Sequence, residues 1–117
     1  MRASEFHTKE KHEEGTKVFL VAPDGTKTEE FVVVRGKDSA AFRRAQAEYR
    51  DKQVAAAVDK TTFDTLLEGY KLTASTIKAW SLEDPLTEAS ALELLSNAPY
   101  LVDAIDAAIF DTKRFFM

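Results

Sequence analysis

The chain has 117 residues and a net charge of −4 at pH 7, with 44% hydrophobic and 31% charged residues. This balance is typical of a single globular domain, and it argues against a disordered chain and against nucleic acid as the main partner. Since the chain contains no cysteine, disulfides, thiolate catalysis and cysteine-ligated metals are excluded, and no apolar run approaches the length of a membrane span.

Residues 1–16 form a polar segment of mixed charge, and Phe6 is its only large apolar side chain after the initial methionine. Gly15 is typical of a helix end, so we expect a short, weak helix or disorder here. His7 and His12 are five residues apart, which does not suit a metal-binding pair on one helix face, and we expect both on the surface. The charged start lacks an apolar signal core, which together with the absence of cysteine favours a cytoplasmic protein.

Residues 17–35 predict a β-hairpin. Two compact β-prone runs, Val18–Val21 and Phe31–Val34, flank a strong turn signal at Pro23–Thr26. Proline presets φ in such a turn, and Gly25 accepts positive φ. Because a lone hairpin is only marginally stable, these strands must pack on helices or pair with the edge of another chain.

The segment 38–117 predicts about four helices. The first runs from about residue 40 to residue 58, and Asp38 or Ser39 is its N-cap. Its run Val54–Val58 is small and apolar, which suits a close contact with another helix.

The second helix begins near Thr61 or Thr62, and its apolar residues keep the spacing i, i+3, i+4, i+7 from Phe63 to Trp80. The sequence Glu83-Asp84-Pro85 then breaks the helix, because the residue before a proline disfavours helical geometry.

Two short helices follow this break. Thr87 caps a leucine-rich helix, and Pro99 stands where the first turn of a last apolar helix tolerates it. A hairpin followed by helices indicates an α+β fold, with one domain over residues 17–117.

No constellation of catalytic residues is apparent, so we predict a protein that is not an enzyme and carries no metal or cofactor. The carboxylate pairs Glu83-Asp84 and Asp103/Asp106 lie in a loop and on a solvated helix side, where neither suits acid–base catalysis. No serine has the context of a nucleophile elbow, and four glycines could hardly build a phosphate loop. The arginine-rich stretch 43–52 has few aromatics, which argues against nucleic-acid binding.

Charge is unevenly distributed along the chain. Residues 35–60 hold seven Lys/Arg and four Asp/Glu, whereas residues 79–112 hold seven Asp/Glu and no Lys/Arg. Two interpretations stay open: two solvated faces of one fold, or self-complementary association in which basic helices of one subunit meet acidic helices of the next.

Three aromatic residues could serve either the core or a partner. Trp80, the only tryptophan, either fills the gap between its helix and the Pro85 turn or is a partly exposed binding residue. Phe115 and Phe116, beside Met117, either dock on their own chain or contact another subunit or a client.

The order of motifs resembles the small tail assembly chaperones of long-tailed bacteriophages and prophages. The shared pattern is a polar N-terminal segment, a hairpin with a Pro-Asp-Gly turn, and a helix that begins near Asp-Ser and is rich in Arg, Ala and Gln. The residues that carry the second half of the pattern are Trp80, the acidic proline-containing turn Glu83–Leu86, a leucine-rich helix, Asn97-Ala98-Pro99-Tyr100-Leu101, Ile105-Asp106 and Arg114-Phe115-Phe116.

This resemblance implies a non-enzymatic protein of the bacterial host cytoplasm that is absent from the mature virion. Its expected client is the tape measure protein, a long helical protein that such chaperones keep soluble during tail assembly. The resemblance also implies a homo-oligomer and allows a longer form of the protein made by ribosomal frameshifting; neither nucleic acid nor membrane is an expected partner.

We predict that apolar helix faces bind the client, through Tyr70, Ile77, Trp80, Leu82, Phe115 and Phe116. The alternative is a structural protein of the virion, a tail completion or connector subunit whose hairpin edge builds a ring.

Overall fold

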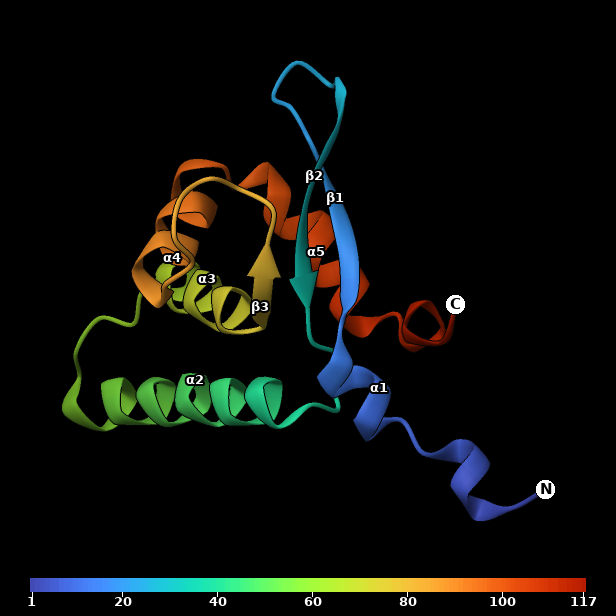
Figure 1. Cartoon of the computed structure of the whole chain (residues 1–117). Helices are drawn as coiled ribbons and strands as arrows, with labels where there is room; N and C mark the ends of the chain where they lie inside the picture. The colour runs from blue at the N-terminus through green and yellow to red at the C-terminus, as the bar shows by residue number, and fades with distance from the viewer.

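The computed structural model describes all residues, 1–117, and shows an α+β fold. A three-stranded antiparallel sheet has the strand order β1-β2-β3, in which β1 is Thr16–Val21, β2 is Lys27–Val34 and β3 is Ile77–Trp80. Five helices accompany the sheet (Figure 1): α1 (Lys9–Glu14), α2 (Ala40–Asp59), α3 (Thr65–Ser75), α4 (Glu88–Asn97) and α5 (Tyr100–Phe110). Two short 3-10 helices, η1 (Ala3–Phe6) and η2 (Thr112–Phe116), lie near the two ends. The predicted α+β class with an N-terminal hairpin is confirmed.

The hairpin forms where its turn residues predict it. Gly25 has a φ of 89°, in the left-handed region that glycine tolerates, and the Ala22 N–H donates to the Thr26 carbonyl oxygen at 2.8 Å. Along β1 the side chains alternate, so Val18 and Leu20 are buried while their neighbours are exposed. One face of the sheet therefore packs in the hydrophobic core.

The third strand corrects the sequence prediction. Helix α3 ends at Ser75, and the last residues of the predicted helix, Ile77–Trp80, form β3 instead. β3 pairs antiparallel with β2, and it places Ile77 opposite Val34 and Trp80 opposite Val32. A strand of the same chain therefore completes the sheet that the hairpin begins.

The free edge of β2 explains this change from helix to strand. The Arg35 N–H donates to the Thr76 carbonyl oxygen at 2.9 Å, and the Ser81 N–H donates to the Phe31 carbonyl oxygen at 3.0 Å. A helix continuing to residue 80 would leave these groups of β2 without a partner, which costs free energy where they are shielded from water.

Side-chain caps start three helices. Ser39 caps α2 and Thr87 caps α4, each by accepting a backbone N–H three residues further on, as the sequence predicts. Helix α3 differs, because its cap is Asp64 and not Thr61 or Thr62. The second helix is therefore shorter than predicted at both ends.

The core lies between the inner face of the sheet and helices α4 and α5. Figure 1 shows α5 crossing behind β1 and β2, where its apolar face meets theirs. The core cluster contains Val18, Leu20, Val32 and Val34 of β1 and β2, Ala91 and Leu95 of α4, and Leu101, Ile105, Ala108 and Ile109 of α5, together with Phe42 of α2, Ala74 of α3 and Ile77 of β3. These residues bury a continuous apolar surface, the main favourable term in folding.

The N-terminal segment docks on the fold, and the prediction that His12 lies on the surface is wrong. Helix α1 contacts η2, and the side chain of His12 is 0% exposed next to the junction between β2 and α2. Gly36 permits this approach, because a Cβ atom there would overlap the His12 ring. His7 is exposed, as predicted.

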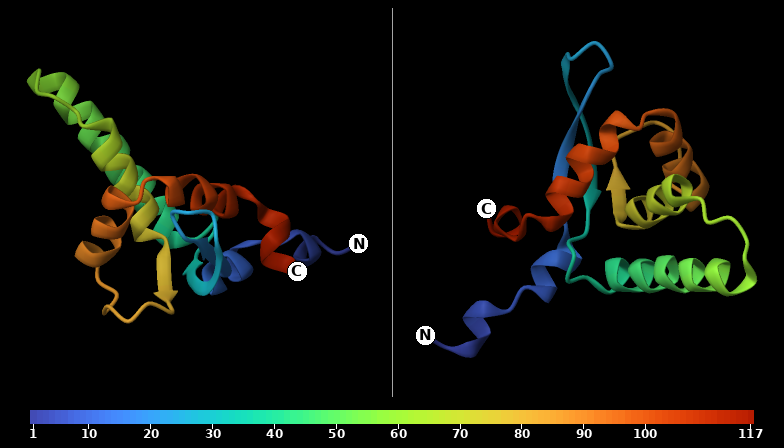
Figure 2. Two further views of the ribbon diagram at one scale, coloured as in Figure 1. Left: turned by 90° about the horizontal axis from the view of Figure 1, so that it is seen from above. Right: turned by 180° about the vertical axis from the view of Figure 1, so that it is seen from behind.

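The C-terminal part of helix α2 projects from the fold (Figure 2), whereas its first turn packs on the core through Phe42. In the view from above, its C-terminal end projects away from the sheet and from α5 (Figure 2). Only Phe42, Ala45 and Ala56 of its 20 residues are buried. The radius of gyration of 15.5 Å accordingly exceeds the roughly 13 Å expected for a compact domain of this length.

Candidate functional site

The six residues predicted to bind a partner do not form one exposed surface. Ile77 and Phe115 are buried, at 8% and 6% exposure, and therefore serve the interior of this chain. Tyr70, Trp80 and Leu82 are half-buried and pack against the core, whereas Phe116 is exposed in η2. Neither Ile77 nor Phe115 is accessible to a partner in this structure, because the Ile77 side chain lies in the core and the Phe115 ring packs on the His12 ring.

Trp80 closes the loop that follows β3. Its indole Nε1–H donates to the Asp84 carbonyl oxygen at 2.8 Å, and its ring packs against the core from the strand. Of the two interpretations of this tryptophan, filling the space before the Pro85 turn is the one that its contacts match.

Several exposed apolar side chains lie on the arm, which we define as residues 49–71, from the second half of α2 through the connection to the first half of α3. Four large apolar side chains of the arm are exposed: Val54, Val58, Leu66 and Leu67. Val58 and Leu66 are the most open, at 74% and 68% exposure. Val54 and Val58 stand four residues apart and so share one side of α2, and an exposed apolar helix side of this kind is typical of a binding surface.

Specific contacts hold the two helices of the arm together. The rings of Tyr49 and Phe63 meet edge to face with their centroids 5.2 Å apart. Glu68 of α3 accepts hydrogen bonds from Lys52 of α2 at 3.1 Å and from Lys71 at 3.2 Å. Burial opposes the ionisation of Glu68, but the two lysines outweigh it and hold the pKa of this carboxyl below its usual range.

A groove runs along the inner side of α2, between this helix and α3 and α4. It consists of two hollows of about 430 and 330 Å³ that share Ala45, Glu48, Ala74, Ser75 and Glu88 as lining residues. The buried alanines Ala45, Ala74 and Ala91 line these hollows beside exposed charged side chains of both signs. The small alanine side chains allow another helix or an extended chain to approach closely.

No group of three His, Cys, Asp or Glu side chains converges as a metal site, and none of the helices has the length and apolar character needed to cross a membrane. The exposed apolar side of α2 at Val54 and Val58 is suited to an amphipathic helix, which presents residues at i, i+3, i+4 and i+7.

The sequence contained a partial signal for the arm. The small apolar run Val54–Val58 predicts a close helix–helix contact, but within it only Ala56 is buried, and the other four residues are exposed. Helix α2 lacks a continuous apolar stripe, and this is the feature that could have indicated a helix with little core to contact.

Comparison of the chain with models of known protein families found no match, and comparisons with curated proteins and with solved structures found none either. The fold and the site therefore define the class by themselves: a small α+β protein that presents an exposed apolar helical arm and a groove.

Proposed function

We propose that this protein is a phage tail assembly chaperone, which binds the tape measure protein in the bacterial host cytoplasm and keeps it soluble while the tail assembles. The observation that carries the proposal is the arm, whose large apolar side chains Val54, Val58, Leu66 and Leu67 are exposed. The order of sequence motifs from the Pro23–Thr26 turn to Phe116 supports the choice of client.

The arm suits a long helical client for a physical reason. An amphipathic helix that lies against the arm covers apolar side chains on both partners, and each Å² removed from water contributes about 25 cal/mol. Each copy offers only a few such residues, so a single contact is weak. Several copies along one long client then bind through avidity. Many weak contacts keep the client soluble and still allow it to be released when the tail assembles.

The test is co-expression with the tape measure protein of the same phage. We expect the client to be soluble only with this chain and to co-purify with several copies of it. Val58→Lys and Leu66→Lys should each reduce the soluble client, because a lysine in the contact must lose its hydration. Val21→Lys, at an exposed valine of the sheet, is the matched control and should behave as wild type.

Each result bears on a different part of the proposal. If the wild-type chain leaves the client insoluble and elutes alone, the chaperone function is wrong. If the wild type solubilises the client and both arm variants do so equally well, the function stands but the site lies elsewhere. Detection of the chain in purified virions at a fixed copy number would favour the alternative, a tail completion or connector subunit.

A further inference from the structure

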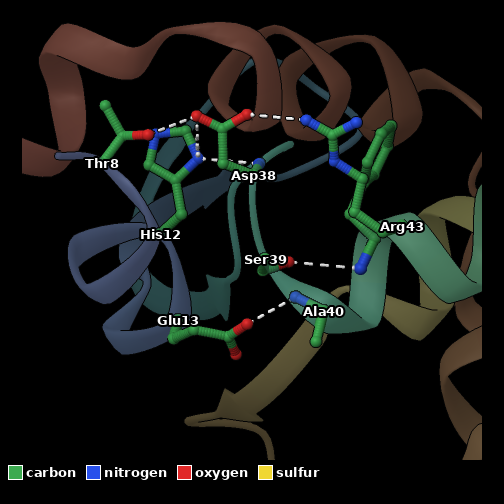
Figure 3. A network of polar contacts seen from close by, with 8 residues as sticks. Thr8, His12, Glu13, Asp38, Ser39, Ala40 and Arg43 are labelled. Carbon is green, nitrogen blue, oxygen red and sulfur yellow. Dashed lines mark hydrogen bonds and ion pairs between the residues drawn. The ribbon is translucent and has the colours of Figure 1, made fainter.

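A network of polar contacts joins α1 to the junction between β2 and α2 (Figure 3). His12 lies at its centre: the Asp38 N–H donates to His12 Nδ1 at 3.0 Å, and the Gly36 N–H donates to the His12 carbonyl oxygen at 3.0 Å. Around it, the Thr8 hydroxyl donates to the Asp38 carboxylate, and the Ala40 N–H donates to Glu13. The network therefore binds α1 to the first turn of α2.

The same histidine also holds the C-terminal 3-10 helix η2. The rings of His12 and Phe115 lie 4.5 Å apart and are tilted by 32°. Phe115 is buried, but neither ring belongs to the main hydrophobic core. Two segments far apart in the sequence, α1 and η2, are thus packed against each other, and the His12–Phe115 ring pair lies in their contact.

The geometry requires His12 to be neutral. Because Nδ1 accepts the Asp38 N–H, the ring proton must lie on Nε2, and Nε2 is buried without a hydrogen-bond partner. A second proton could only be placed on Nδ1, where it would oppose the Asp38 N–H and break that hydrogen bond. The imidazolium would also be a charge inside an apolar contact with Phe115.

The charged groups around His12 do not offset the unfavourable free energy of protonating its buried ring. Burial lowers the pKa of His12; Asp38, with Oδ2 3.9 Å from Nδ1, raises it, and Lys37 lowers it, so that the pKa stays below its usual value. The other charged groups face elsewhere. Glu13 of α1 pairs with Arg35 at 3.8 Å, and Arg114 of η2 donates to the Lys17 carbonyl oxygen at 2.7 Å.

We propose that His12 is a pH-sensitive latch, which holds α1, η2 and the start of α2 together when neutral and releases α1 and η2 when protonated, while the sheet and core stay folded. The release is local because α1 has only six residues, too short to persist as a helix without its docking contacts. This latch is independent of the proposed client.

The direction of the pH effect follows from linkage. The docked state binds protons less tightly than the released state, in which the histidine has its ordinary pKa of 6.5. Docking is therefore strongest above pH 6.5 and weakens as the pH falls below it, by at most about tenfold per pH unit. Below the lowered pKa that His12 has in the docked state, the docking free energy no longer changes with pH. Asp38 does not contribute here, because its pKa is lowered from 3.8 and it remains ionised.

Two measurements on the whole chain test the latch. The chain has two histidines, so an NMR titration of the ring protons gives one signal for His12 and one for the exposed His7. Amide hydrogen exchange at pH 7.5 and 5.5, corrected for the intrinsic rate, compares residues 9–14 and 112–116 with the sheet. His12→Gln removes the titration but keeps an acceptor for the Asp38 N–H, and His7→Gln is the matched control.

We expect the His12 signal to titrate below pH 6.5 and exchange in both segments to rise severalfold at pH 5.5, with the sheet unchanged. The rise should persist in His7→Gln and disappear in His12→Gln. An unchanged exchange rate in α1 and η2 of the wild type would refute the latch, even if His12→Gln fails to fold. So would an equal rise in the sheet, which means global unfolding, or a rise that persists in His12→Gln.

Discussion

The ring of Tyr49 in α2 meets the ring of Phe63 edge to face at 5.2 Å, and this contact ties the connection before α3 back onto α2. The arm therefore has a defined shape although most of its surface faces solvent. A double-mutant cycle with Tyr49→Leu and Phe63→Leu should give a coupling energy of about 0.5–1.5 kcal/mol in urea denaturation. A coupling energy near zero would show that the two rings do not stabilise the arm together.

Two glycines should respond to alanine with opposite signs. Gly36→Ala should lower the free energy of unfolding by about 1–3 kcal/mol, because the new Cβ overlaps the buried His12 ring. Gly69→Ala should raise it by up to about 1 kcal/mol, since that glycine lies inside α3 with no atom within 4 Å of the added Cβ. Thermal unfolding of the two variants beside the wild type checks both signs, and a stabilising Gly36→Ala would contradict the packing described around His12.

Trp80→Phe should weaken the closure of the loop after β3. The variant keeps an aromatic ring against the core but loses the hydrogen bond to the Asp84 carbonyl oxygen, at a cost of about 0.5–1.5 kcal/mol. Since Trp80 is the only tryptophan, unfolding should be followed by circular dichroism. We further expect Trp80→Phe to solubilise the client as the wild type does. If the folded variant no longer solubilised the client, Trp80 would be a client-binding residue after all.

The arm substitutions should leave the fold intact. Val58→Lys and Leu66→Lys change highly exposed side chains, so the free energy of unfolding should stay within about 0.5 kcal/mol of the wild type. Urea denaturation checks this expectation and separates a binding defect from misfolding. A loss of several kcal/mol would mean that these side chains are covered in solution.

Asp106→Asn should stabilise the protein at neutral pH. Burial raises the pKa of Asp106; the Thr73 hydroxyl, which donates to it at 2.7 Å, opposes this rise, and the nearby Asp103 adds to it. A raised carboxyl pKa favours the folded state below the ordinary value of 3.8, and this contribution is lost as the pH rises through the raised value.

The asparagine amide oxygen can still accept from Thr73 but carries no charge, so its advantage should be present at pH 7 and absent at pH 3. Denaturation at both pH values measures it, with Asp103→Asn as a control that gives a smaller gain. An advantage that is equal at both pH values would mean that charge is not its cause.

Local signals in the sequence determined the hairpin and three of the helices. The Pro23–Thr26 turn, the Ser39 cap of α2, and Thr87 and Pro99 before α4 and α5 each act within a few residues of the backbone that they shape. Such signals operate before any distant contact forms, so the α+β class could be inferred from the sequence alone.

Tertiary contacts decided the remaining features. Ile77–Trp80 has helical spacing after α3 but becomes β3, because the edge of β2 needs hydrogen-bond partners. His12 lies in a polar, charged segment yet is fully buried, because Gly36, Asp38 and Phe115 surround it from elsewhere in the chain. The sequence alone could not predict the exposure of the arm either. It shows which side chains are apolar, whereas only the packed structure shows which of them contact other residues.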